Sequence, residues 1–67
     1  MAKKPFTPVQ RQAEIRRLLL TQEEASIEDL ARRLGASPAT IRRDLDLLET
    51  EAPIERTHGG ARIRPIR

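Results

Sequence analysis

Between residues 8 and 22 the apolar positions repeat at the spacing of an α-helix. Thr7 is suited to the N-cap and Pro8 to the first helical position, while Gln10 completes a capping box with Thr7. We therefore predict a first helix over residues 8–22, with an apolar side formed by Val9, Ala13, Ile15, Leu18 and Leu19. Residues 1–6 lack this repeat, which indicates a flexible basic arm.

Two further helices are predicted with only a short turn between them. Ser26, followed by Asp29, repeats the capping signal and predicts a helix over residues 27–34, after which Gly35 is suited to positive φ. Ser37 is a third N-cap, and Pro38 begins a helix predicted over residues 38–51. The buried sides would be formed by Leu30, Ala31, Leu34, Ile41, Leu45 and Leu48. So tight a turn between two helices is typical of a helix-turn-helix.

After Ala52-Pro53 the pattern changes from helical to strand-like. Two short runs with β-branched residues flank Gly59-Gly60, which predicts a β-hairpin with a two-residue loop. A hairpin of this size is not stable alone, so we expect Ile54 and Ile63 to pack against the helices. The predicted fold is mainly α (α+β), a three-helix winged helix-turn-helix with a C-terminal β-hairpin wing over residues 54–64. The domain would span residues 7–64, and residues 65–67 would be a tail or the start of a linker.

Composition restricts the class of protein. A chain of 67 residues has room for one small core, and the absence of cysteine excludes disulfides and thiolate metal sites. His58 is the only histidine, so we expect no metal site and no cofactor. No catalytic set or phosphate-binding glycine loop is present, so we expect no enzyme. No apolar run could span a bilayer and no signal peptide is evident, so we expect a cytoplasmic protein without a membrane partner.

The charge distribution favours an anionic partner. The net charge is +3, with five basic and one acidic residue in residues 1–17 and four basic and one acidic residue in residues 52–67. Arg42 and Arg43 lie in the first two turns of the third helix, opposite its apolar stripe, although the helix dipole disfavours cations there. Arginine matches guanine edges and phosphates, which favours double-stranded DNA as the partner. The alternative is surface ion pairs with Asp46 and with the acids of the second helix.

The predicted DNA contacts fall into three groups. In the recognition helix, Thr40, Arg42 and Arg43 would meet the major groove, and the backbone amides of the segment Ser37, Pro38 and Ala39 would hold a phosphate. The wing would contribute Arg56, His58, Gly59, Gly60, Arg62 and Arg64, although the two glycines could equally serve the turn alone. Long-range attraction would come from Lys3, Lys4 and Arg11. The acids Asp44, Asp46, Glu49 and Glu51 lie mostly toward the helix end that would point away from the duplex.

Two motifs carry a resemblance to a known family. The segment SPATIRRDL at residues 37–45, followed by Leu48-Glu49 and by RTHGGA at residues 56–61, closely resembles the N-terminal DNA-binding domain of DeoR-family bacterial transcriptional regulators. The resemblance covers roughly residues 8–63 and includes Arg11, Ile15, Leu18 and the IEDLA segment at residues 27–31. It implies a duplex-DNA-binding regulator, usually a repressor of sugar or nucleoside metabolism.

The resemblance also sets limits. Family members have a larger C-terminal domain that senses a phosphorylated metabolite and oligomerises, so a sugar-phosphate effector and a homodimer on DNA would depend on a domain absent from these 67 residues. Glycine is common in the family where Ala52 stands, so we expect Ala52 to leave the helix in extended geometry before Pro53. The rival function is a winged-helix protein-interaction module, for which Leu20, Leu47 and Ile66 are the candidates for an exposed apolar patch.

Overall fold

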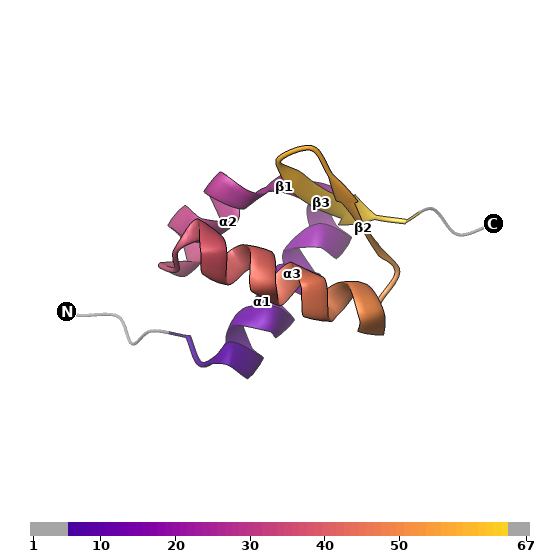
Figure 1. Cartoon of the computed structure of the whole chain (residues 1–67). Helices are drawn as coiled ribbons and strands as arrows, with labels where there is room; N and C mark the ends of the chain where they lie inside the picture. The colour runs from indigo at the N-terminus through magenta and orange to yellow at the C-terminus, as the bar shows by residue number, and fades with distance from the viewer. Residues whose placement is uncertain (1–5, 65–67) are drawn as a thin grey trace.

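The computed structural model, which describes residues 6–64, contains three helices and a small antiparallel sheet (Figure 1). The helices are α1 (Pro8–Gln22), α2 (Ile27–Leu34) and α3 (Pro38–Glu51), and the strands are β1 (Glu24–Ser26), β2 (Ile54–Thr57) and β3 (Gly60–Ile63). The predicted bounds of all three helices are confirmed, as is the winged helix-turn-helix architecture. Residues 1–5 of the predicted arm and the predicted tail at residues 65–67 lie outside the described residues.

Side-chain caps explain where the helices begin. The Thr7 hydroxyl accepts a hydrogen bond from the Gln10 amide at 3.1 Å, and the Thr7 amide donates to Gln10 Oε1 at 3.0 Å. Ser26 and Ser37 cap α2 and α3 in the same way, each accepting from the amide three residues later. Each cap satisfies an amide that would otherwise have no partner inside the helix.

The residues that end the three helices adopt two different backbone conformations. Gly35 ends α2 with a φ of 66°, as predicted, and Glu23 adopts a φ of 72° after α1 although it is not glycine. Ala52 ends α3 in an extended conformation with a φ of −141°, which confirms the expectation for an alanine before Pro53. The path from α3 into the wing therefore needs no residue at positive φ.

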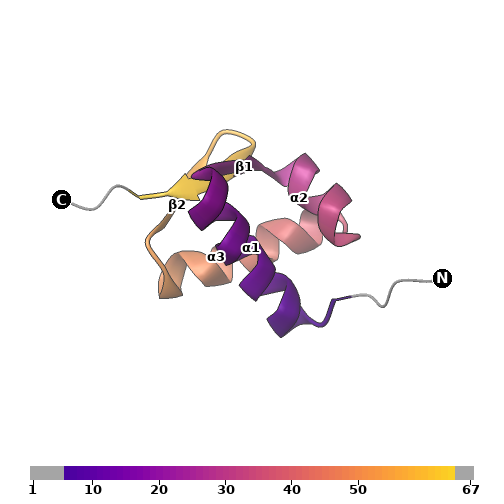
Figure 2. The ribbon, with the colours of Figure 1, turned by 180° about the vertical axis from the view of Figure 1, so that it is seen from behind.

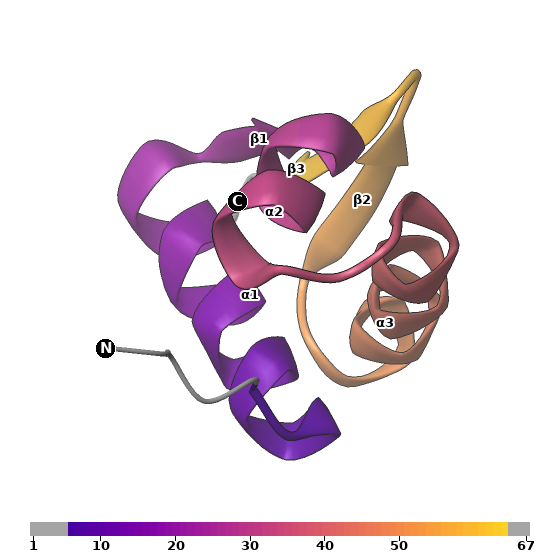
Figure 3. The ribbon, with the colours of Figure 1, turned by 90° about the vertical axis from the view of Figure 1, so that its left-hand side faces the viewer.

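The core lies where α1 crosses α3 and where both meet α2 and the sheet (Figure 2). Its largest fully buried side chains are Ile15, Leu19, Leu30, Ile41, Leu45, Leu48 and Ile54. The predicted buried stripe of α3 is confirmed. The predicted apolar side of α1 is wrong at its N-terminal end, because it included Val9 and Ala13. Val9 is 76% exposed and Ala13 is exposed, because the first turns of α1 project beyond the body of the other helices (Figure 3).

The sheet has one strand more than the predicted hairpin. Its order is β1-β3-β2, so the last strand in the sequence lies at the centre and pairs with both others. Ala25 of β1 lies opposite Ala61 of β3, and both side chains are buried. The Ile27 amide at the start of α2 donates to Gly59 O at 2.9 Å, which ties the hairpin turn to that helix. β1 and the start of α2 therefore hold the wing along one edge, formed by β3 and its turn.

The hairpin turn is displaced by one residue from its predicted position. Thr57 pairs with Gly60, so the two turn residues are His58 and Gly59, and the predicted Gly59-Gly60 loop is wrong. Gly59 has a φ of 85°, as a tight turn requires. Gly60 is buried in β3, where an added Cβ would lie 2.2 Å from Ala25 O. Its lack of a side chain permits the close approach of β3 to β1, and this contact fixes the register.

Candidate nucleic-acid interface

The start of α3 presents two arginines to solvent. Arg42 and Arg43 are exposed, and neither forms a salt bridge with any residue between 6 and 64. On α2, by contrast, Arg32 and Arg33 both bond to Asp29 within their own helix. The ion-pair alternative for Arg42 and Arg43 is therefore not observed, and their donors remain available to an external acceptor.

The first turn of α3 is equally accessible. Ser37, Pro38 and Ala39 are exposed, while Thr40 is half-buried. The Ser37 hydroxyl lies 3.0 Å from the Thr40 hydroxyl and accepts from the Thr40 amide, so the Thr40 side chain is held against the cap. Early amides of a helix lack intrahelical acceptors and carry partial positive charge, which suits the exposed helix start to a phosphate.

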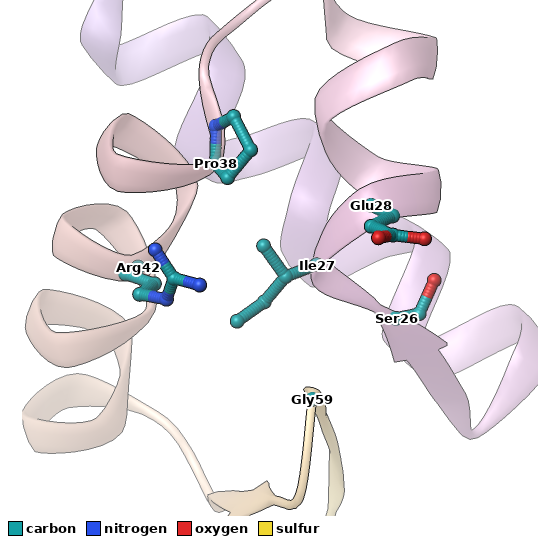
Figure 4. A pocket seen from close by; sticks show the side chains of 6 residues that line it. All are labelled: Ser26, Ile27, Glu28, Pro38, Arg42 and Gly59. Atoms are coloured by element: carbon teal, nitrogen blue, oxygen red, sulfur yellow. The ribbon is translucent and has the colours of Figure 1, made fainter.

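A groove separates the start of α3 from the start of α2 and from the hairpin turn. It encloses about 340 Å³ and is lined by Ser26, Ile27, Glu28, Pro38, Arg42 and Gly59. Figure 4 shows the guanidinium of Arg42 directed into the groove, on the side that faces Ile27. The start of the recognition helix and the wing turn thus border one groove, and Glu28 adds a carboxylate that was not predicted there.

A buried ionic contact fixes the orientation of α3. The Asp44 side chain is 4% exposed; it accepts from Nε of Arg11 and, at 3.2 Å and 3.1 Å, from Arg11 Nη2 and Gln12 Nε2. The hydrogen bond to Asp44 raises the pKa of Arg11 above its ordinary value. Because Asp44 follows Arg43 directly, the contact with α1 holds the helix turn that carries both recognition arginines.

This contact corrects two expectations. Arg11 was predicted to attract DNA at long range, but its side chain is 15% exposed and its charge is matched by Asp44. Asp44 was expected among the acids at the outward end of the helix, yet it is buried. At 100° per residue, Asp44 lies only about 40° from Leu48 around the helix axis, and this angle is a signal that could have revealed its burial.

The arginines of the wing differ in their ion pairs with acidic side chains of the protein. Arg56 Nη1 donates to Asp46 Oδ1 of α3 at 2.5 Å, and Arg62 Nε donates to Glu55 Oε1 at 2.9 Å. The bond to Glu55 raises the pKa of Arg62, but both side chains are about half exposed. Arg64 is exposed and has no salt bridge with residues 6–64.

The remaining predicted wing residues divide between the turn and the interior. His58 and Gly59 are exposed at the turn, whereas Gly60 is buried, so we remove Gly60 from the candidate contacts. Lys3 and Lys4 lie outside the described residues. The structure thus brings Pro38, Arg42 and Gly59 to one groove. Side chains alternate along β2, so Arg56 lies on the face toward α3 and Glu55 on the opposite face.

Comparison with known proteins assigns the family. The model of the DeoR-like helix-turn-helix domain matches residues 11–65. The chain belongs to this family. It is 48% identical over 54 residues to the HTH-type transcriptional regulator GlpR of Haloferax volcanii, a match that covers 81% of the chain and 21% of that relative. It is 41% identical over 54 residues to the HTH-type transcriptional regulator GolR of Listeria innocua, with the same two coverages.

The DeoR-like assignment fits the helix-turn-helix geometry and confirms the resemblance seen in the sequence. The chain spans about a fifth of the length of these two relatives. No solved structure shows a significant match to the chain. The domain is thus a DNA-binding helix-turn-helix of the type found in transcriptional regulators.

No helix within residues 6–64 has the length and apolar character needed to cross a membrane. Over the same part of the chain, no three His, Asp or Glu side chains gather as a metal-ligand set. Leu20 and Leu47, two of the residues named for a protein-interaction patch, are exposed on different helices, while Ile66 lies outside the described residues.

Proposed function

We propose that this DeoR-like domain is a sequence-specific reader of duplex DNA within a transcriptional repressor of the cytoplasm, without catalytic activity. The observation that carries the proposal is the pair of exposed arginines, Arg42 and Arg43, at the start of a helix whose orientation is fixed by the buried Asp44–Arg11 contact. A guanidinium without an internal acceptor gains most from an external one, and DNA offers both guanine edges and phosphates.

Each part of the interface has its own role in the proposed complex. The start of α3 enters the major groove, where Arg43, Arg42 and Thr40 meet base edges or clamp the backbone. The backbone amides of Ser37 and Ala39, both exposed residues, hold a phosphate, while Pro38 between them has no N–H to donate. The hairpin turn with His58 and Gly59, together with Arg64 and the outward Arg62, lies along the backbone and contributes affinity without base discrimination. Lys3 and Lys4 add a salt-sensitive attraction.

Regulation is proposed to depend on chain outside this domain. The relatives are about five times longer than the matched segment, which leaves room for a domain that pairs two copies on DNA and senses a sugar phosphate. Such pairing would place two recognition helices on two half-sites.

The test begins with selection from a random duplex library, followed by fluorescence anisotropy on the enriched duplex and on a scrambled duplex across a salt series. We expect a consensus sequence and an affinity that falls as salt rises, because released counterions contribute to binding. If no sequence is enriched, the chain is fused to a neutral dimeriser and the selection is repeated. A second failure would favour the protein-interaction function.

The first variant to measure is Arg43→Ala. If Arg43 meets a base, the substitution weakens binding to the enriched duplex by about 1–3 kcal/mol and barely affects the scrambled duplex. Arg64→Ala is the matched control, since the removal of a wing side chain that touches only the DNA backbone lowers the affinity for both duplexes alike. Equal reductions on both duplexes for Arg43→Ala would refute its base-reading role.

A further inference from the structure

One carboxylate lies among the exposed residues of the recognition helix. Asp46 follows Arg42 by one helical turn and lies on the side of α3 opposite its buried stripe. Its side chain is 68% exposed, and it accepts one hydrogen bond, at 2.5 Å, from Nη1 of Arg56. A negative charge at this position repels the phosphates of an approaching duplex. What happens to the Asp46–Arg56 pair when DNA binds therefore affects the affinity.

Arg56 is a cation with few of its donors satisfied. It extends from β2 toward α3, its side chain is 29% exposed, and its Nε is buried without a hydrogen-bond partner among the described residues. A guanidinium carries five N–H donors, and a single bond to Asp46 uses one of them. The cation is thus partly removed from water and held by one end-on contact.

We propose that Asp46 acts as an internal competitor for DNA: it occupies Arg56 in the free protein, and a backbone phosphate replaces it when DNA binds. The inference rests on the proposed function. An exposed ion pair contributes only about 0–1 kcal/mol, so it opens at little cost. A phosphate offers two oxygens to the planar guanidinium, and such paired charge-assisted bonds are stronger than a single one.

The exchange has a definite consequence for DNA binding. Because Asp46 competes for a backbone contact, it subtracts the same amount from the affinity for every duplex sequence. Discrimination between sequences then remains with Arg42 and Arg43, while binding to random DNA is kept weak. Asp46 is thus a residue that sets the general affinity and leaves the preferred sequence unchanged.

The first test compares Asp46→Asn with Glu49→Gln, each of which removes one negative charge from an exposed position of α3. Glu49 forms no salt bridge with residues 6–64, so it reports the effect of charge alone. We expect Asp46→Asn to tighten binding about three- to fivefold on both the enriched and the scrambled duplex. Glu49→Gln should change the affinity by less than about twofold.

The second test repeats Asp46→Asn in an Arg56→Gln background. If DNA takes over Arg56, most of the gain from Asp46→Asn depends on Arg56 and falls to the level of the Glu49→Gln control. The proposal is overturned if the gain is the same with and without Arg56, because the effect is then charge removal only. It is also overturned if Asp46→Asn binds no more tightly than Glu49→Gln. Thermal melts of all variants identify any that do not fold.

A measurement on the unmodified chain needs no variant. In an NMR titration with the enriched duplex, the Asp46 carboxylate carbon and the Arg56 guanidinium nitrogens should both shift as their bond opens. An Asp46 carbon signal that stays unchanged at saturation would refute the exchange. A chain that binds no duplex even when fused to the neutral dimeriser overturns the proposed function and the inference together, whereas specific binding with an unaltered Asp46–Arg56 pair overturns the inference alone.

Discussion

Two aspartates of α3 stand two residues apart and belong to different regions of the molecule. Asp44 faces α1, is 4% exposed and receives hydrogen bonds from both Arg11 and Gln12. Asp46 faces the wing, is 68% exposed and receives one bond from Arg56. The same side chain on the same helix therefore supports the fold in one region and remains exchangeable in the other.

The difference follows from helix geometry and desolvation. A step of two residues turns the side chain by about 200°, which places one carboxylate toward the core and the other toward solvent. A buried carboxylate needs several donors because it is cut off from water, whereas an exposed one keeps water as an alternative partner. Rigidity is therefore concentrated in the α1–α3 contact and adaptability in the α3–wing contact.

The largest effect is expected at the α1–α3 contact. Asp44→Ala should lower the free energy of unfolding by about 3–5 kcal/mol, because it leaves Arg11 largely buried without its counterion. A single core in a chain this short supplies only about 3–5 kcal/mol, so chemical denaturation should show a mostly unfolded protein.

A paired substitution supplies the control for Asp44→Ala. Arg11→Met combined with Asp44→Leu replaces the ion pair with apolar side chains and should recover most of the stability. If Asp44→Ala costs less than about 1 kcal/mol, the buried contact contributes no more than an exposed pair and the comparison fails.

A smaller effect is expected where the wing meets β1. Gly60→Ala places a methyl group against Ala25 O, which forces β3 away from β1 and should lower the free energy of unfolding by about 1–3 kcal/mol. Amide hydrogen exchange should quicken at Ile27 and Ile63, whose amides bond to Gly59 O and Glu23 O. Amides of Leu45 and Leu48 should keep their protection; equally fast exchange there would show that wing and helices open as one unit.

The smallest effect is expected at an ion pair on the surface of α1. A hydrogen bond from Arg17 lowers the pKa of Glu14 below its ordinary value of 4.5. A lowered carboxyl pKa stabilises the folded state above pH 4.5, and this contribution is lost as the pH falls below that value. Glu14→Gln should therefore reduce the melting temperature slightly at pH 7 and leave it unchanged near pH 2; an equal reduction at both pH values would exclude the ion pair as the cause.

The helices could be predicted from the sequence because their signals are local. Thr7, Ser26 and Ser37 each cap the amide three residues later, and that bond depends on no distant part of the chain. The exposed arginines of α3 were predictable for the same reason, since the helix angle alone separates them from the apolar stripe. The fold class and the recognition helix could therefore be predicted from signals that lie within single helices.

The features that could not be predicted from the sequence depend on contacts between segments that are far apart in the chain. The three residues of β1 carry no strand pattern, and they form a strand only because β3 pairs with them. The hairpin turn lies one residue earlier than predicted because Gly60 belongs to β3, where its backbone packs against Ala25 and leaves no room for a side chain. Asp44 is buried by an arginine 33 positions earlier in the chain. Each outcome required knowledge of which segments meet in space.

The pairing of β1 with β3 also sets an order in time. Ser26 lies opposite Gly60, and Ala25 opposite Ala61, so the strand between the first two helices waits for residues made much later during synthesis. On the ribosome, α1, α2 and α3 can form from local contacts while the backbone groups of β1 remain without their strand partner. Because β3 lies between β1 and β2, the three-stranded sheet can form only after β3 has emerged.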